Sequence, residues 1–135
     1  MVKTATKVPD SEKITINMGF VDLGQIKLLV QEGFYSNRSD FIRTAIRNQI
    51  ERHAETVREI VIRKSVDLGL RHITQAELAG AKEAGQMLDI RALGLVVITS
   101  DVTPELARET ISALTVLGSL QADHAVKAAL ADRIT

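Results

Sequence analysis

Residues 13–18 alternate strictly between polar and apolar side chains. Because side chains along a strand repeat with a period of two, this alternation predicts a short β-strand with two unlike faces. The apolar face would carry Ile14, Ile16 and Met18. The opposite face would be purely polar, with Lys13, Thr15 and Asn17.

Two patterns with helical spacing follow the strand. The first is formed by Leu23, Ile26 and Val30, and the second by Phe41, Ile42, Ala45, Ile46 and Ile50. The second helix could continue to Val57. A unit of one short strand and two helices leaves the strand without a partner and encloses little core. A second copy of the chain completes it most simply, so we expect a homodimer, with a higher oligomer left open.

Beyond Arg58 the pattern changes. Residues 59–73 have alternating β-branched side chains and favour one or two strands, although their first half is also compatible with helix. The residues from Thr74 to about Gly85, from Thr103 to about Ser112, and from Asp123 to about Arg133 carry helix-start signals and predict helices. The apolar runs at 88–99 and 114–120 predict strands between them. The pieces LGLVV and TVLGSL resemble each other, so a small curved stack of repeats is an alternative to the generic α/β or α+β domain that we prefer.

The segment GFYSNRSDFIRTAIRNQI, residues 33–50, lies at the right distance behind the predicted strand to resemble a known family. Over roughly the first 55 residues the chain resembles the ribbon-helix-helix DNA-binding proteins of the Arc, MetJ and CopG type. In that family two chains pair their strands into an antiparallel ribbon that enters the major groove of DNA. We therefore expect an α+β chain, with a flexible arm at 1–12, an intertwined β-α-α unit at 13–57 and a mixed α/β domain at 58–135.

The resemblance implies that Lys13, Thr15 and Asn17 face the DNA bases. Their chemistry agrees, because lysine donates to guanine acceptors, threonine bonds a base or touches a thymine methyl group, and asparagine pairs with adenine. An ordinary solvated strand face is the alternative interpretation.

The second helix begins with good N-cap residues, since Asn37 comes three positions before Asp40. The free amides at a helix start attract phosphate. The residues expected to contact the DNA phosphates are Ser36, Asn37, Arg38 and Ser39. Simple helix capping is the alternative, and it becomes the less favoured one only when the strand and the family pattern are considered together.

The 17 basic and 17 acidic residues balance over the chain of 135 residues, but not along it. Residues 1–64 hold 11 basic against 8 acidic residues, and residues 65–135 hold 6 against 9, so the net charges are +3 and −3. The basic half contains the expected DNA-binding surface, and its bias is modest. Phosphate contacts would have to be placed individually, and binding should depend on salt.

Other functions find little support in the sequence. The chain has no Cys, so disulfides and thiolate sites are excluded. The three histidines, His53, His72 and His124, are too widely spaced for a metal site of the kind found in nickel-sensing relatives, and no cofactor is expected. No phosphate-binding glycine loop or catalytic motif occurs, so we do not expect an enzyme. No apolar run suits a membrane span or a signal peptide, which predicts a cytoplasmic protein without membrane contact.

Two functions of different classes remain. The leading hypothesis is a sequence-specific transcriptional regulator, most simply a repressor, that binds double-stranded DNA as a homodimer. The alternative is a protein-interaction or assembly factor, including an antitoxin-like protein, that uses the N-terminal unit only for dimerisation. The C-terminal half is rich in apolar residues and capped elements, which favours a folded effector or assembly domain over a disordered tail. Its ligand or protein partner is not identified by the sequence.

Overall fold

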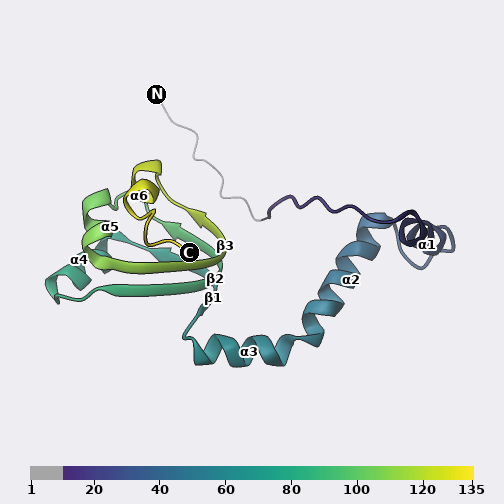
Figure 1. The fold of residues 1–135 in the computed structure, drawn as a ribbon, viewed down its shortest axis with the longest axis horizontal. Coiled ribbons are helices and arrows are strands. Elements are labelled where there is room, and N and C mark those ends of the chain that lie inside the picture. Colours follow the sequence, from purple (N-terminus) through teal and green to yellow (C-terminus); the bar gives the residue numbers. More distant parts are fainter. Residues whose placement is uncertain (1–10) are drawn as a thin grey trace. The chain divides into compact units, whose positions relative to one another are not determined.

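The computed structural model describes residues 11–135 and divides the chain into two compact units (Figure 1). One unit ends at Val57 and the other comprises Arg58–Thr135. The arm expected at residues 1–12 lies almost wholly outside the described residues. Each unit is described by itself below.

The first unit is built from two helices, α1 (Phe20–Gln31) and α2 (Arg38–Arg52), where the sequence predicted them. Between them Gly33 adopts a φ of 83°, which only glycine adopts without strain. The amide of Phe34 bonds back to the carbonyl of Leu29 at 3.0 Å, which closes the end of α1. Tyr35 and Phe41 then pack edge to face with ring centroids 4.9 Å apart. The turn is therefore held by local hydrogen bonds and an aromatic pair.

Residues 11–19, which include the predicted strand, are assigned neither helix nor strand. A strand is recognised by hydrogen bonds to a neighbouring strand, and in a single chain this segment has no neighbouring strand to pair with among the described residues. The three strands of the described chain all lie in the second unit and are parallel. The intertwined β-α-α arrangement thus stays a prediction for the paired protein.

The prediction for the region around Arg58 is wrong in its first half. Helix α2 ends at Arg52, and a separate helix α3 (Ala54–Arg63) follows where strands were favoured. Its β-branched residues have strand propensity, but Val57, Ile60 and Val61 also recur at helical spacing along one side. The helix closes with Ser65 at a φ of 51° and a hydrogen bond of 3.0 Å from the Val66 amide to the Val61 carbonyl.

The second unit alternates strands and helices, as predicted. In chain order these are β1 (Asp67–Ile73), α4 (Gln75–Glu83), β2 (Leu88–Ile98), α5 (Pro104–Thr110), β3 (Ile111–Gln121) and α6 (His124–Ala129). Thr74 and Thr103 cap α4 and α5 by accepting backbone amides at 3.2 and 3.1 Å. Helices α5 and α6 end before Ser112 and Arg133, because strand β3 starts directly at Ile111 and the final residues turn back to bond with it.

The strands form one parallel sheet in the order β1, β2, β3, so each strand lies beside the next one in the sequence. Helices α4, α5 and α6 follow one another along the same stack (Figure 1). Gly69, Gly94 and Gly118 stand in register in the three strands and all have positive φ values, from 100° to 138°. These glycines recur every 24 or 25 residues, so the unit is a small stack of strand-helix repeats. The unit is thus the mixed α/β domain that the sequence predicted, and its order within that class is the repeat arrangement that was the less favoured alternative.

One continuous core fills the space between the sheet and these helices. Its fully buried side chains include Ile73, Leu78, Val96, Ile111, Leu114, Val126 and Leu130. Inward residues alternate with outward ones along each strand, so the opposite face of the sheet is not part of this core.

Candidate nucleic-acid interface

Lys13, Thr15 and Asn17, the expected base-reading residues, lie in the segment that precedes α1. All three are exposed in the single chain. The apolar residues that alternate with them are exposed as well, Ile14 at 77% and Ile16 at 66%. A chain on its own therefore leaves both sides of this segment in water.

The start of α2 brings together the four residues expected to contact phosphate. Asn37 is the N-cap, and its Oδ1 accepts the amide of Asp40 at 2.8 Å. Asp40 accepts the amide of Ser36 in return, at 3.0 Å. This reciprocal pair caps the helix and commits the Ser36 amide and the Asn37 oxygen to local bonds. The first helical amides, at Arg38 and Ser39, come before the first amide that bonds back within the helix, that of Phe41.

The positive charge at this helix start is reinforced from α1. Lys27, Val30 and Gln31 of α1 line a pocket of about 330 Å³ together with Arg38 of α2. Both cations are exposed. Sequence reasoning missed Lys27, because periodicity places it next to the buried Ile26 but does not tell which end of α2 lies nearby. Only the packing of α1 on α2 provides that information.

The first unit has almost no interior of its own. Ile26, at 3% exposure, is the one buried hydrophobic residue among its described residues. Large apolar side chains of the same unit stay open to water, among them Ile14, Ile16, Phe20, Val21, Leu28, Phe34, Ile46 and Ile50. Soluble monomers rarely leave so many large apolar side chains in water, and extensive exposed apolar surface is typical of an interface.

Ligand sites of other kinds were sought over the same part of the chain. No group of three or more His, Asp or Glu side chains is placed to share a metal ion among residues 11–135. His53 stands 3.4 Å from the side-chain nitrogen of Gln49, and His72 and His124 lie on β1 and α6. None of the described helices is long and apolar enough to cross a bilayer.

The first unit has two helices, an alternating segment before them and cations at the start of the second helix. This combination is typical of small DNA-binding regulators. The model of the ribbon-helix-helix transcriptional regulator family matches residues 9–127, and the chain belongs to this family. Neither the comparison with curated proteins nor that with solved structures gave a match. Proteins of this family are DNA-binding transcriptional regulators that typically bind as dimers and are generally not enzymes.

Proposed function

We propose that the protein is a homodimeric, sequence-specific repressor that inserts a two-stranded antiparallel ribbon into the major groove of its operator. The observation that carries this proposal is the first unit's missing interior. Among the hydrophobic residues described for this unit only Ile26 is buried, while Ile14, Ile16, Ile46 and Ile50 are exposed. A second copy that pairs the two segments 13–18 would give each strand a partner and cover the apolar face. The polar face would then point away from the dimer.

Lys13, Thr15 and Asn17 occupy that polar face and are the base-reading residues of the proposal. Their exposure supports the role, because all three side chains are open to water in the described part of the chain. Two ribbons related by a twofold axis read two half-sites, so the operator should be a palindrome or nearly one.

The start of α2 anchors the dimer on the phosphates through Ser36, Asn37, Arg38 and Ser39. These residues have different roles in the proposal. The side-chain oxygen of Asn37 holds the cap, whereas in this proposal the amides and side chains of Arg38 and Ser39 bind the phosphate. We add Lys27, which lines the same pocket as Arg38 and brings a second cation. Two cations help to offset the nearby carboxylate of Asp40.

The unit from residue 58 onward serves assembly or effector binding in this proposal, and the unit before it binds DNA. We place the protein in the cytoplasm with the DNA it regulates. The chain divides into two compact units, and the core of the second unit is formed by its own residues, which supports the division of labour.

Mapping of the bound DNA across a genome, followed by titration of the recovered site at several salt concentrations, tests the proposal. A regulator should recover a recurrent, near-palindromic site and bind it with a steep salt dependence. Dimerisation without any preferred site, at any salt concentration, would favour the interaction-protein alternative instead.

A further inference from the structure

The second unit has an exposed apolar sheet face that the helices do not cover. It is formed by Leu68 and Leu70 of β1, by Leu93, Leu95 and Val97 of β2 and by Leu117 of β3, and we refer to it as the outer leucine face. The register aligns Leu68, Leu93 and Leu117 in one row and Leu70 and Leu95 in the next. The three outermost leucines, Leu68, Leu70 and Leu117, are exposed at 67%, 60% and 59%.

This face carries no charged side chain apart from the ends of its strands. The outward charges of β2, Asp89 and Arg91, precede the glycine row and pair with each other at 3.0 Å. Arg91 also donates to the Lys64 carbonyl at 3.0 Å. From the leucine rows onward the outward residues are Leu, Val, Ser and Gln, with His72 near the end of β1. Such a face suits an apolar partner of the same kind.

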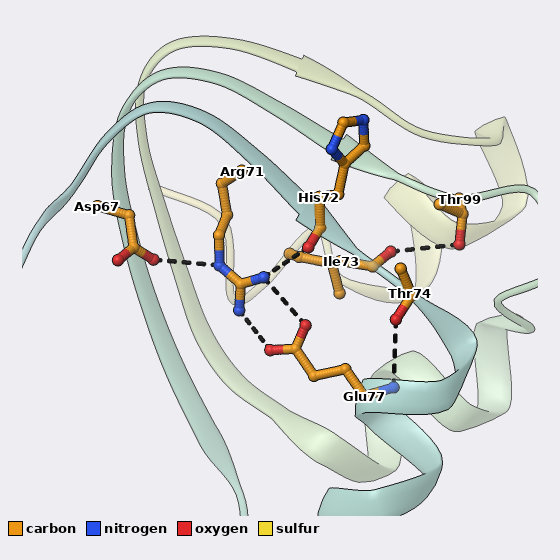
Figure 2. A network of polar contacts seen from close by, with 7 residues as sticks. All are labelled: Asp67, Arg71, His72, Ile73, Thr74, Glu77 and Thr99. Atoms are coloured by element: carbon orange, nitrogen blue, oxygen red, sulfur yellow. Dashed lines mark hydrogen bonds and ion pairs between the residues drawn. The ribbon is translucent and has the colours of Figure 1, made fainter.

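The edge of the sheet at β1 carries a cluster of charged side chains, one of which bonds to the strand's backbone. Ile73 turns its carbonyl toward β2, where Thr99 donates at 3.0 Å, so the carbonyl of the preceding residue, His72, faces the free edge. The guanidinium of Arg71 donates to that carbonyl and is held there by Glu77 and Asp67 (Figure 2). In the other strands the positions of Asp67 and Arg71 are apolar, namely Ala92 and Val96 in β2. The first repeat thus has charged residues, Asp67 and Arg71, where the next repeat has apolar ones, as is usual for the terminal repeat of a stack.

At the β3 edge, residues 133–135 bond to the middle of the strand. The amides of Leu114 and Val116 donate to the carbonyls of Arg133 and Thr135 at 2.9 and 3.0 Å, and the Thr135 amide returns a bond to Leu114. Arg108 fixes this terminal segment by donating to Asp132 at 2.8 Å, and that hydrogen bond lowers the pKa of the Asp132 carboxyl. Part of each edge is therefore already bonded, and the outer leucine face is the apolar surface that the sheet offers for association.

We propose that the outer leucine face packs against the same face of the second copy of the chain within the dimer, an inference that rests on the dimer of the proposed function. Each exposed leucine offers on the order of 100 Å² of apolar surface. The whole face therefore falls short of the roughly 800 Å² a side that a free-standing complex buries. It suffices once the first unit has joined the two chains, because the tethered copies meet at an effective concentration in the millimolar range. A face that meets itself across a twofold axis is also the simplest dimer contact.

The absence of Cys allows a direct test in the full chain. Leu95→Cys places a thiol at the centre of the face, and a bismaleimide with a span of about 10 Å matches the spacing of two packed sheets. Met87→Cys, a half-exposed apolar residue in the turn before β2, is the matched control. We expect at least tenfold more covalent dimer from Leu95→Cys than from Met87→Cys. Adding Leu70→Glu and Leu117→Glu should remove the excess.

The tether is tested by adding Ile46→Asp, which should reduce the Leu95→Cys product at least tenfold. Crosslinking of Leu95→Cys no better than Met87→Cys overturns the inference, and leaves the face to a different protein. Operator binding, measured on the same preparations, reports the proposed function separately. A preparation that binds its operator as a dimer but does not crosslink refutes this inference alone.

Discussion

The carbonyl oxygen of Gly69 lies where a Cβ atom on Gly94 would have to be, and Gly94 stands in the same relation to Gly118. Gly94 and Gly118 are thus doubly restricted, by a positive φ and by the backbone of the preceding strand. Gly69 also has a positive φ, of 100°, but nothing lies within 4 Å of its Cβ position, because β1 is the edge strand of the described sheet. Comparing Gly69 with Gly94 therefore separates the free-energy cost of the strained backbone from the cost of the steric clash with the neighbouring strand.

We expect Gly94→Ala to destabilise the second unit far more than Gly69→Ala. Gly69→Ala has only the strained conformation to accommodate, about 1–3 kcal/mol, whereas Gly94→Ala must also push two strands apart. The total loss of unfolding free energy for Gly94→Ala should exceed about 4 kcal/mol, which is a large part of the stability of a small domain. Urea unfolding followed by circular dichroism measures both.

Gly80→Ala is the control for this comparison, because Gly80 lies within α4 with open space around its Cβ position. It should stabilise the unit by up to about 1 kcal/mol through helix propensity. Equal losses for Gly94→Ala and Gly69→Ala would show that the strands do not approach each other as closely as the structure has them.

Local signals made most of the second unit predictable from the sequence. The start of α4 follows from Thr74 and Glu77, and that of α5 from Thr103 and Pro104, because a cap needs only residues within one turn. The glycine row could not be recognised in advance, since its reason is the register between strands about 25 residues apart. Helix α3 was missed because Ile60, Val61 and Ile62 satisfy both a strand propensity and a helical spacing.

In the candidate site, too, local features were predictable from the sequence and features that depend on packing were not. The cap of α2 was predictable because Asn37 and Asp40 are three residues apart and bond as that spacing suggests. Lys27 was not, because its approach to Arg38 depends on how two helices pack. The pairing of residues 13–18 depends on a second chain, and no pattern within one chain can specify its geometry.

The ribbon face provides a prediction about specificity. Thr15→Ala and Asn17→Ala should each reduce the preference for the operator over random DNA by about 1–3 kcal/mol, because each removes a base contact. Thermal stability should hardly change, since both side chains are exposed. Competition binding with operator and random duplexes measures the preference, and Gln86→Ala, an exposed substitution in the second unit, is the control. Undiminished preference in both variants would count against readout by the ribbon.

The start of α2 provides a prediction about salt. Arg38→Ala and Lys27→Ala should weaken binding to operator and random DNA alike, because phosphate contacts are independent of sequence. The slope of log K against log salt should decrease by about one for each phosphate lost. Ser39→Ala should weaken binding without changing that slope. Arg63→Ala, on α3, removes the same charge elsewhere and serves as the control.

Asn37→Ala should behave differently from the cation variants. Its side-chain oxygen caps α2 at 2.8 Å from the Asp40 amide, so the substitution should cost about 1 kcal/mol of stability in the absence of DNA. Thermal unfolding of the free protein measures this. If Arg38→Ala reduced stability as much as Asn37→Ala and left the salt slope unchanged, Arg38 would be a structural residue rather than a phosphate contact.

The last prediction concerns Ile46, which is 48% exposed in the single chain although it belongs to the apolar stripe of α2. In the proposed dimer Ile46 is covered by the second copy, as is Ile16 on the ribbon. Ile46→Asp would place an unpaired carboxylate in a dry interface, at a cost of several kcal/mol, which is comparable to the whole stability of a small dimer.

Folding and association of the first unit should therefore be lost together in Ile46→Asp, because no stable folded monomer remains. Asn48→Asp adds a carboxylate of the same size two residues further, on the other side of α2, and should leave the dimer intact. The circular dichroism of Ile46→Asp should lose the contribution of α1 and α2 but keep that of the second unit, whose core is its own. Sedimentation of Ile46→Asp as a fully folded monomer would refute the obligate dimer, and with it the two-chain ribbon on which the proposed DNA readout depends.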